Sequence, residues 1–90
     1  MAQKIVVVTG CSTGIGLETA VLLAKDPNSR FKVFATMRNT SKKAQLEVAA
    51  RGALDKTLFI RQLDVTKEDS IEDFMDKINR EEGGVDILSK

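Results

Sequence analysis

The chain has 90 residues, with 14 lysines and arginines against 13 acidic residues, no histidine and a single cysteine. This length allows one domain, the near-zero net charge gives no indication of nucleic-acid binding, and one thiol excludes an internal disulfide. One thiol fits a reducing intracellular compartment, so we expect a cytoplasmic protein. We expect no metal site, because histidine, the commonest zinc ligand, is absent, and no transmembrane segment, because no stretch reaches the ~20 apolar residues of a membrane span.

The first predicted element is a strand over residues 5–8, followed by a helix over residues 15–25. The strand is β-branched throughout, which is typical of a strand buried on both faces of a parallel sheet. In the helix, apolar residues recur at a spacing that forms one stripe, namely Leu17, Ala20, Val21 and Ala24. Pro27 and Asn28 are expected to end this helix.

The loop between these two elements reads Thr9-Gly10-Cys11-Ser12-Thr13-Gly14-Ile15-Gly16. Gly10 permits a sharp turn off the strand, Gly14 lets the backbone approach phosphate oxygens, and Gly16 lets the helix pack closely. An anion there meets free backbone N–H groups and the positive end of the helix dipole, and the hydroxyls of Ser12 and Thr13 can donate to it. The loop predicts a site for a dinucleotide diphosphate, and the alternative is a structural turn without a ligand.

The rest of the chain continues the alternation of strands and helices. Strands are predicted at residues 31–37, 57–63 and 85–88, and helices from about 42 to 53 and from 66 to the glycines at 83–84. Thr40 or Ser41 is expected to cap the first of these helices, and Thr66 with Asp69 to form a capping box on the second. The order β-α-β-α-β-α-β implies parallel strands joined by right-handed crossovers. We therefore predict an α/β fold, a Rossmann-type doubly wound parallel sheet with strand order 3-2-1-4 that is incomplete on its C-terminal side.

The segment after the second strand decides which dinucleotide is expected. An NAD site usually carries an acidic residue there, which binds the ribose 2′-hydroxyl. No acidic residue lies between Pro27 and Leu46, and the same window holds five cations, Arg30, Lys32, Arg38, Lys42 and Lys43. A guanidinium can hold a 2′-phosphate through paired hydrogen bonds, and Arg38 lies at the expected end of the strand. We predict NADP(H), with an ordinary solvated arginine as the alternative.

Asp64 and Val65 follow the third strand, at the edge of the sheet where ligands bind in such folds. The Asp64 carboxylate can accept a hydrogen bond from the adenine amino group, and Val65 offers its backbone N–H and an apolar surface. The alternative is that Asp64 only begins the turn before Thr66.

Two potentially reactive side chains are given no chemical role. We interpret Cys11 as a small residue that the glycine-rich loop needs, although a helix N-terminus can lower the pKa of a thiol. We interpret Asp86 as a polar residue at the start of the fourth strand, outside the site.

The pattern Thr9-Gly-x-x-x-Gly-Ile-Gly16 resembles the cofactor motif of the short-chain dehydrogenase/reductase family. The fuller string, with Phe-Ala-Thr-Met-Arg after it, resembles the branch that contains 17β-hydroxysteroid dehydrogenase type 1 and the photoreceptor-type retinol dehydrogenases. Asp64-Val65 and the segment Val85-Asp86-Ile87-Leu88 also match family positions. The resemblance implies contacts from Ser12 to the 2′-phosphate and from Asp64 and Val65 to adenine. It also implies an alcohol–carbonyl oxidoreductase that acts on a lipid-like small molecule, a steroid or retinoid, as a homodimer.

The family's catalytic residues are not in this chain. Family members use a serine with Tyr-x-x-x-Lys, and carry Asn-Asn-Ala-Gly after the fourth strand, whereas this sequence has no tyrosine and ends Ser89-Lys90. We expect residues 1–90 to be the N-terminal, cofactor-binding part of a longer enzyme, inactive alone and marginally stable. Two alternatives are a non-catalytic nucleotide-binding or partner-binding module, and a flavin- or phosphosugar-binding domain.

Overall fold

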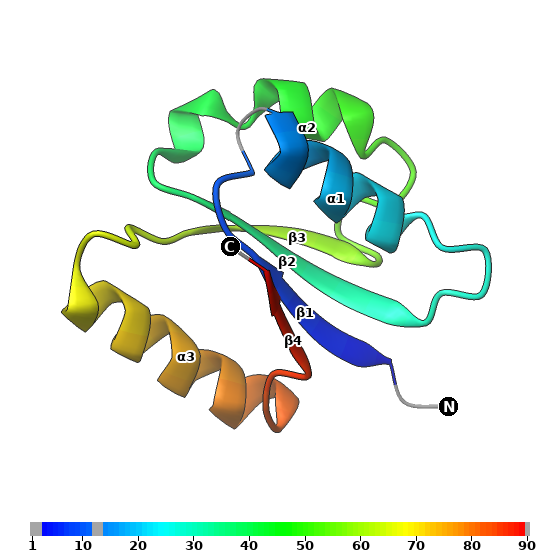
Figure 1. Ribbon diagram of the computed structural model, residues 1–90. Helices are drawn as coiled ribbons and strands as arrows, with labels where there is room; N and C mark the ends of the chain where they lie inside the picture. Colours follow the sequence, from blue (N-terminus) through cyan, green and yellow to red (C-terminus); the bar gives the residue numbers. More distant parts are fainter. Residues whose placement is uncertain (1–2, 12–13, 90) are drawn as a thin grey trace.

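The computed structural model describes residues 3–11 and 14–89, which form a four-stranded sheet covered by helices (Figure 1). The strands are β1 (Lys4–Val8), β2 (Phe31–Met37), β3 (Leu58–Gln62) and β4 (Ile87–Ser89). The helices are α1 (Gly14–Ala24), the 3-10 turn η1 (Thr40–Lys42), α2 (Ala44–Ala49) and α3 (Glu68–Glu82). The sheet order is β3-β2-β1-β4 and each pairing is parallel, which confirms the predicted Rossmann-type topology.

The helices form a layer on each face of the sheet, with α1 and α2 on one side and α3 on the other (Figure 1). Because side chains alternate along a strand, Val6 and Val8 pack with α1 and α2, whereas Ile5 and Val7 pack with α3. All four residues are buried, as the β-branched run predicts. None of the described helices has the length and hydropathy of a membrane span.

The helix predicted over residues 42–53 is shorter than expected and is capped differently. Only Ala44–Ala49 is α-helical, after the 3-10 turn Thr40–Lys42. Asn39 caps the 3-10 turn, since its backbone is extended and its side-chain oxygen accepts a hydrogen bond from Ser41 N at 3.0 Å. Helix α2 itself has Lys43 at its N-cap position and no side-chain capping bond. The expectation that Thr40 or Ser41 caps this helix was wrong, because both residues lie in the 3-10 turn that precedes it.

The capping box predicted at Thr66 and Asp69 was also wrong. Both the backbone N–H and the hydroxyl of Thr66 donate to Asp64 Oδ1, so the threonine side chain is used in a turn that precedes the helix. Helix α3 begins two residues later, with Lys67 at its N-cap position and no side-chain capping bond. Aspartates commonly compete for nearby backbone groups in this way.

The last strand begins at Ile87, two residues later than predicted, because Asp86 is bound to the start of β1. Its N–H donates to Ile5 O at 2.9 Å, and its Oδ2 accepts from Ile5 N at 2.8 Å. The aspartate thus fixes the position from which β4 pairs with β1, in the register Val6 to Ile87.

Candidate cofactor-binding site

The loop between β1 and α1 has the backbone that the glycine pattern predicts. Gly10 and Gly14 have φ values of +66° and +67°, in the left-handed region that favours glycine. A Cβ added at either position would meet no described atom within 4 Å, so the loop leaves open space there for a ligand. Ser12 and Thr13, the predicted hydroxyl donors, lie outside the described residues. Thr9 precedes the turn, and Ile15 lies exposed in the first turn of α1.

Gly16 allows the first turn of α1 to approach the end of β1. A Cβ at this position would lie only 2.9 Å from Gly10 C and 3.0 Å from Thr9 O. Both neighbours are backbone atoms, so a larger residue would displace the loop or the helix. The helix N-terminus, with its positive dipole end, is therefore held next to the glycine-rich loop.

A hydrogen-bond network below the loop joins Val8, Cys11 and Thr36. The Thr36 hydroxyl donates to Val8 O at 3.0 Å, the Cys11 thiol donates to the same oxygen at 3.1 Å, and Cys11 N donates to Thr36 O at 3.0 Å. Burial raises the pKa of the Cys11 thiol to about 11, although the backbone hydrogen bond involving Thr36 acts in the opposite direction. The thiol is buried and protonated, which agrees with its interpretation as a small packing residue. The sequence did not lead us to predict this role for Thr36, although a hydroxyl residue within an apolar strand indicates a buried hydrogen bond.

A polar groove of about 610 Å³ lies at the carboxyl ends of β2 and β3. It is lined by Arg38, Asn39, Gln62, Asp64, Lys67 and Ser70. Parallel pairing of Met37 with Gln62 brings the residues that follow these strands to the same edge of the sheet. Two predicted site residues, Arg38 and Asp64, therefore meet here, with 3.9 Å between Arg38 Nε and Asp64 Oδ2. Gln62 and Lys67 were not predicted as part of this groove.

The two oxygens of Asp64 have different surroundings. Oδ1 accepts the two hydrogen bonds from Thr66, whereas Oδ2 faces Arg38. The hydrogen bonds from Thr66, followed by the charges of Arg38 and Lys67, lower the pKa of the Asp64 carboxyl, so this group is ionised at neutral pH. The turn that was the alternative explanation for Asp64 does form, but it uses one oxygen and leaves the other facing the groove.

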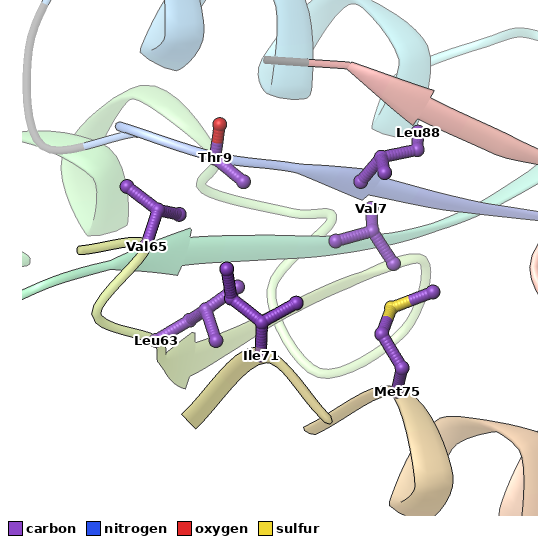
Figure 2. A pocket seen from close by; sticks show the side chains of 7 residues that line it. All are labelled: Val7, Thr9, Leu63, Val65, Ile71, Met75 and Leu88. Carbon is purple, nitrogen blue, oxygen red and sulfur yellow. The ribbon is translucent and has the colours of Figure 1, made fainter. Parts of the chain in front are cut away.

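An apolar hollow of about 340 Å³ includes Val65, the residue that follows Asp64. Its lining comes from β1, β4, α3 and the chain after β3, and comprises Val7, Thr9, Leu63, Val65, Ile71, Met75 and Leu88 (Figure 2). Val65 is about half exposed at this site. Consecutive residues thus line different surfaces, Asp64 the polar groove and Val65 the apolar hollow. Such a pair suits a planar, partly polar ring that needs both a hydrogen-bond acceptor and an apolar contact.

Comparisons with known proteins agree with this geometry. A family model described as short chain dehydrogenase matches residues 4–90. Human retinol dehydrogenase 8 is 48% identical over 87 residues, which cover 97% of this chain and 27% of that protein. Human 17-beta-hydroxysteroid dehydrogenase type 1 is 42% identical over 90 residues, which cover 98% of this chain and 27% of that protein.

The fold is also found among solved structures. A metagenomic short-chain oxidoreductase, crystallised in complex with NADP, superposes with a TM-score of 0.78 at 27% identity. The match covers 94% of this chain and 37% of that one. Among the curated relatives, the chain spans about a quarter of the length of human retinol dehydrogenase 8 and of human 17-beta-hydroxysteroid dehydrogenase type 1.

Proposed function

Because the chain belongs to the short chain dehydrogenase family, whose members use nicotinamide cofactors, we propose that residues 1–90 form the N-terminal cofactor-binding part of an NADP(H)-dependent oxidoreductase. The observation that carries this proposal is the position of Arg38. Its side chain is 79% exposed at the carboxyl end of β2, on the polar groove and beside Asp64. No carboxylate follows β2 where an NAD site would need one, as residues 27–46 contain none.

Each part of the dinucleotide has residues that suit it. We propose that the loop holds the diphosphate, through Thr9, Gly10, Cys11, Ser12, Thr13, Gly14, Ile15 and Gly16. The open space above Gly10 and Gly14 and the adjacent helix N-terminus support this assignment. We assign Arg38 to the 2′-phosphate, Asp64 to the adenine amino group and Val65 to the apolar face of adenine.

The proposed reaction interconverts an alcohol and a carbonyl compound, with a steroid or a retinoid as the substrate. Support for this substrate class comes from the two relatives named retinol dehydrogenase 8 and 17-beta-hydroxysteroid dehydrogenase type 1. When bound, the cofactor supplies or accepts the hydride. We assign no catalytic residue in this chain, which has no tyrosine, and propose that the 90-residue chain alone is inactive.

The full-length enzyme is proposed to be a cytoplasmic homodimer. A single buried cysteine suits a reducing compartment. A second candidate function is a non-catalytic module that binds nucleotide or a partner, and the exposed outer edge of β4 is the observation that favours it. The flavin- or phosphosugar-binding alternative is not supported, because the chain belongs to the short chain dehydrogenase family.

Fluorescence titration of the 90-residue chain with NADPH and NADH tests the cofactor proposal. We expect saturable binding of NADPH that is at least tenfold tighter than that of NADH, because one held phosphate contributes about the 1.4 kcal/mol that a factor of ten requires. Equal affinities would contradict the role given to Arg38. A second assay measures turnover of retinal or estrone with NADPH. Turnover by a full-length form, but not by this chain, would support the oxidoreductase over the non-catalytic module.

A further inference from the structure

The two residues proposed to recognise opposite ends of the adenosine group face each other in the free chain. Arg38 Nε and Asp64 Oδ2 are 3.9 Å apart across the polar groove. Arg38 is mostly exposed, whereas the side chain of Asp64 is only 19% exposed. The arginine is therefore the partner that can move, and the carboxylate is the fixed one.

The remaining contacts of Asp64 leave one oxygen for two different roles. Its Oδ1 is held by the backbone N–H and hydroxyl of Thr66, which fix the carboxylate in the turn before α3. Oδ2 is then the atom that faces Arg38 and also the atom available to an adenine amino group. An interaction between Arg38 and Asp64 thus competes with the contact that Asp64 would make to a nucleotide.

Resting on the proposed function, we propose that Arg38 changes partner when NADP(H) binds. The Arg38 guanidinium moves away from Asp64 Oδ2 and binds the 2′-phosphate. Asp64 Oδ2 then accepts a hydrogen bond from the adenine amino group. Only a dinucleotide with a 2′-phosphate offers the arginine a new anion. NADH does not, so in its complex Arg38 stays beside Asp64. Breaking the ion pair therefore costs free energy when NADP(H) binds, so the pair lowers the affinity for that dinucleotide.

Lys67 makes this exchange feasible for the carboxylate. It lines the same groove, and its charge, like that of Arg38, favours the ionised form of Asp64. When Arg38 moves away, Asp64 retains the Thr66 hydrogen bonds and the nearby lysine. The carboxylate is therefore not left without a compensating positive charge in a partly buried position.

A double-mutant cycle measures the exchange directly. NADPH and NADH affinities are determined for the unaltered chain, Arg38→Met, Asp64→Asn and the double variant. Asp64→Asn removes the charge and can keep the Thr66 hydrogen bonds through its one oxygen, with an NH2 group toward the groove. For NADPH, any loss of the adenine contact is then common to both backgrounds and cancels. Arg38→Met keeps an apolar stem in place of the arginine side chain. Any general repulsion between Asp64 and the 2′-phosphate is the same with and without Arg38, so it cancels in the cycle.

We expect Asp64→Asn to be more favourable for NADPH binding when Arg38 is present than in the Arg38→Met background. The difference should be about two- to fivefold, which is the range of an exposed ion pair, and should shrink as salt is added. As a second readout, the NMR signal of the Arg38 Nε–H should shift on addition of NADPH and stay in place with NADH.

A coupling of zero, or of the opposite sign, for NADPH would overturn the exchange, because it would mean that Arg38 holds Asp64 and the phosphate together. In that case the proposed function stands as long as the unaltered chain prefers NADPH. Failure of the unaltered chain to bind NADPH at all would overturn both the exchange and the proposed function.

Discussion

The hydroxyl of Thr36 donates a hydrogen bond to the carbonyl oxygen of Val8, 3.0 Å away, and so joins the end of β2 to the end of β1. The carbonyl of Thr36 accepts from Cys11 N, so one fully buried residue holds the strand and the first turn of the proposed phosphate loop. Thr36 touches no proposed ligand, and we regard it as a positioning residue for the loop.

Replacing Thr36 with valine should therefore weaken NADPH binding as well as the fold. The variant keeps the shape of the side chain but loses the hydroxyl, at a cost of about 1 kcal/mol in the free energy of unfolding. Thr36→Ser is the matched control, because it keeps the hydroxyl and loses a buried methyl group, which also costs about 1 kcal/mol. Urea unfolding and NADPH titration of both variants test the idea. If the two variants lose NADPH affinity equally, stability and not loop position explains the effect.

Gly16→Ala should abolish tight NADPH binding. The added methyl group would meet Gly10 C at 2.9 Å and Thr9 O at 3.0 Å, and backbone atoms can yield only if the loop or α1 shifts. We expect at least a tenfold loss of affinity, equivalent to about 1.4 kcal/mol. Leu22→Ala, at an exposed position in the same helix, controls for changes in α1 itself. Unchanged NADPH affinity in Gly16→Ala would show that the close approach does not matter for binding.

Arg38→Asp should reverse the cofactor preference from NADPH to NADH. The new carboxylate repels a 2′-phosphate and can accept a hydrogen bond from the ribose 2′-hydroxyl. Arg51→Asp makes the same charge change at an exposed position in the loop after α2, away from the polar groove. In Arg38→Asp the affinity for NADPH should fall and the affinity for NADH should rise. In Arg51→Asp both affinities should stay nearly constant. Parallel changes in the two variants would point to net charge as the cause.

The sequence predicted most of the sheet because its strands carry strong local patterns. The bounds of β2 match the prediction at both ends, and the β-branched run of β1 is buried on both faces as expected. The helix starts were predicted less well, since Thr40 and Ser41 form a 3-10 turn ahead of α2, and Asp64 accepts the Thr66 N–H that the predicted capping box needed. Competition among neighbouring polar residues for the same N–H cannot be read from spacing alone.

The residues of the candidate site were proposed one by one, but not as a set of contacts. Arg38 and Asp64 were each assigned to a part of the cofactor, while their proximity depends on the register that pairs Met37 with Gln62. Lys32 is a further case, because it pairs with Glu82 in α3 and lies over the ring of Phe59, 5.2 Å from the centroid. Contacts between residues so distant in sequence come from packing of the whole domain, which no local motif encodes.

Alkaline pH should destabilise the chain in a way that depends on Cys11. Its pKa is raised from 9.0 to about 11 by burial, so the unfolded state releases this proton at lower pH than the folded state does. Stability linked to the thiol is complete below the unfolded pKa and is lost as the pH rises through the folded one. Urea unfolding between about pH 9 and 11 should show a steeper fall in stability for the unaltered chain than for Cys11→Ala. Parallel curves would contradict the raised pKa.

The outer edge of β4 should make the isolated chain self-associate. Ile87 and Leu88 are 39% and 48% exposed, and an unpaired apolar strand edge tends to pair with another chain. Leu88→Lys places a charge on this edge, and we expect it to lower the association measured by sedimentation velocity over a range of protein concentrations. Val48→Lys makes the same change at an exposed position in α2 and should leave association unaltered. If both lysines lower association equally, general charge repulsion and not the β4 edge explains the effect. If the unaltered chain is monomeric, the role given to the β4 edge is wrong.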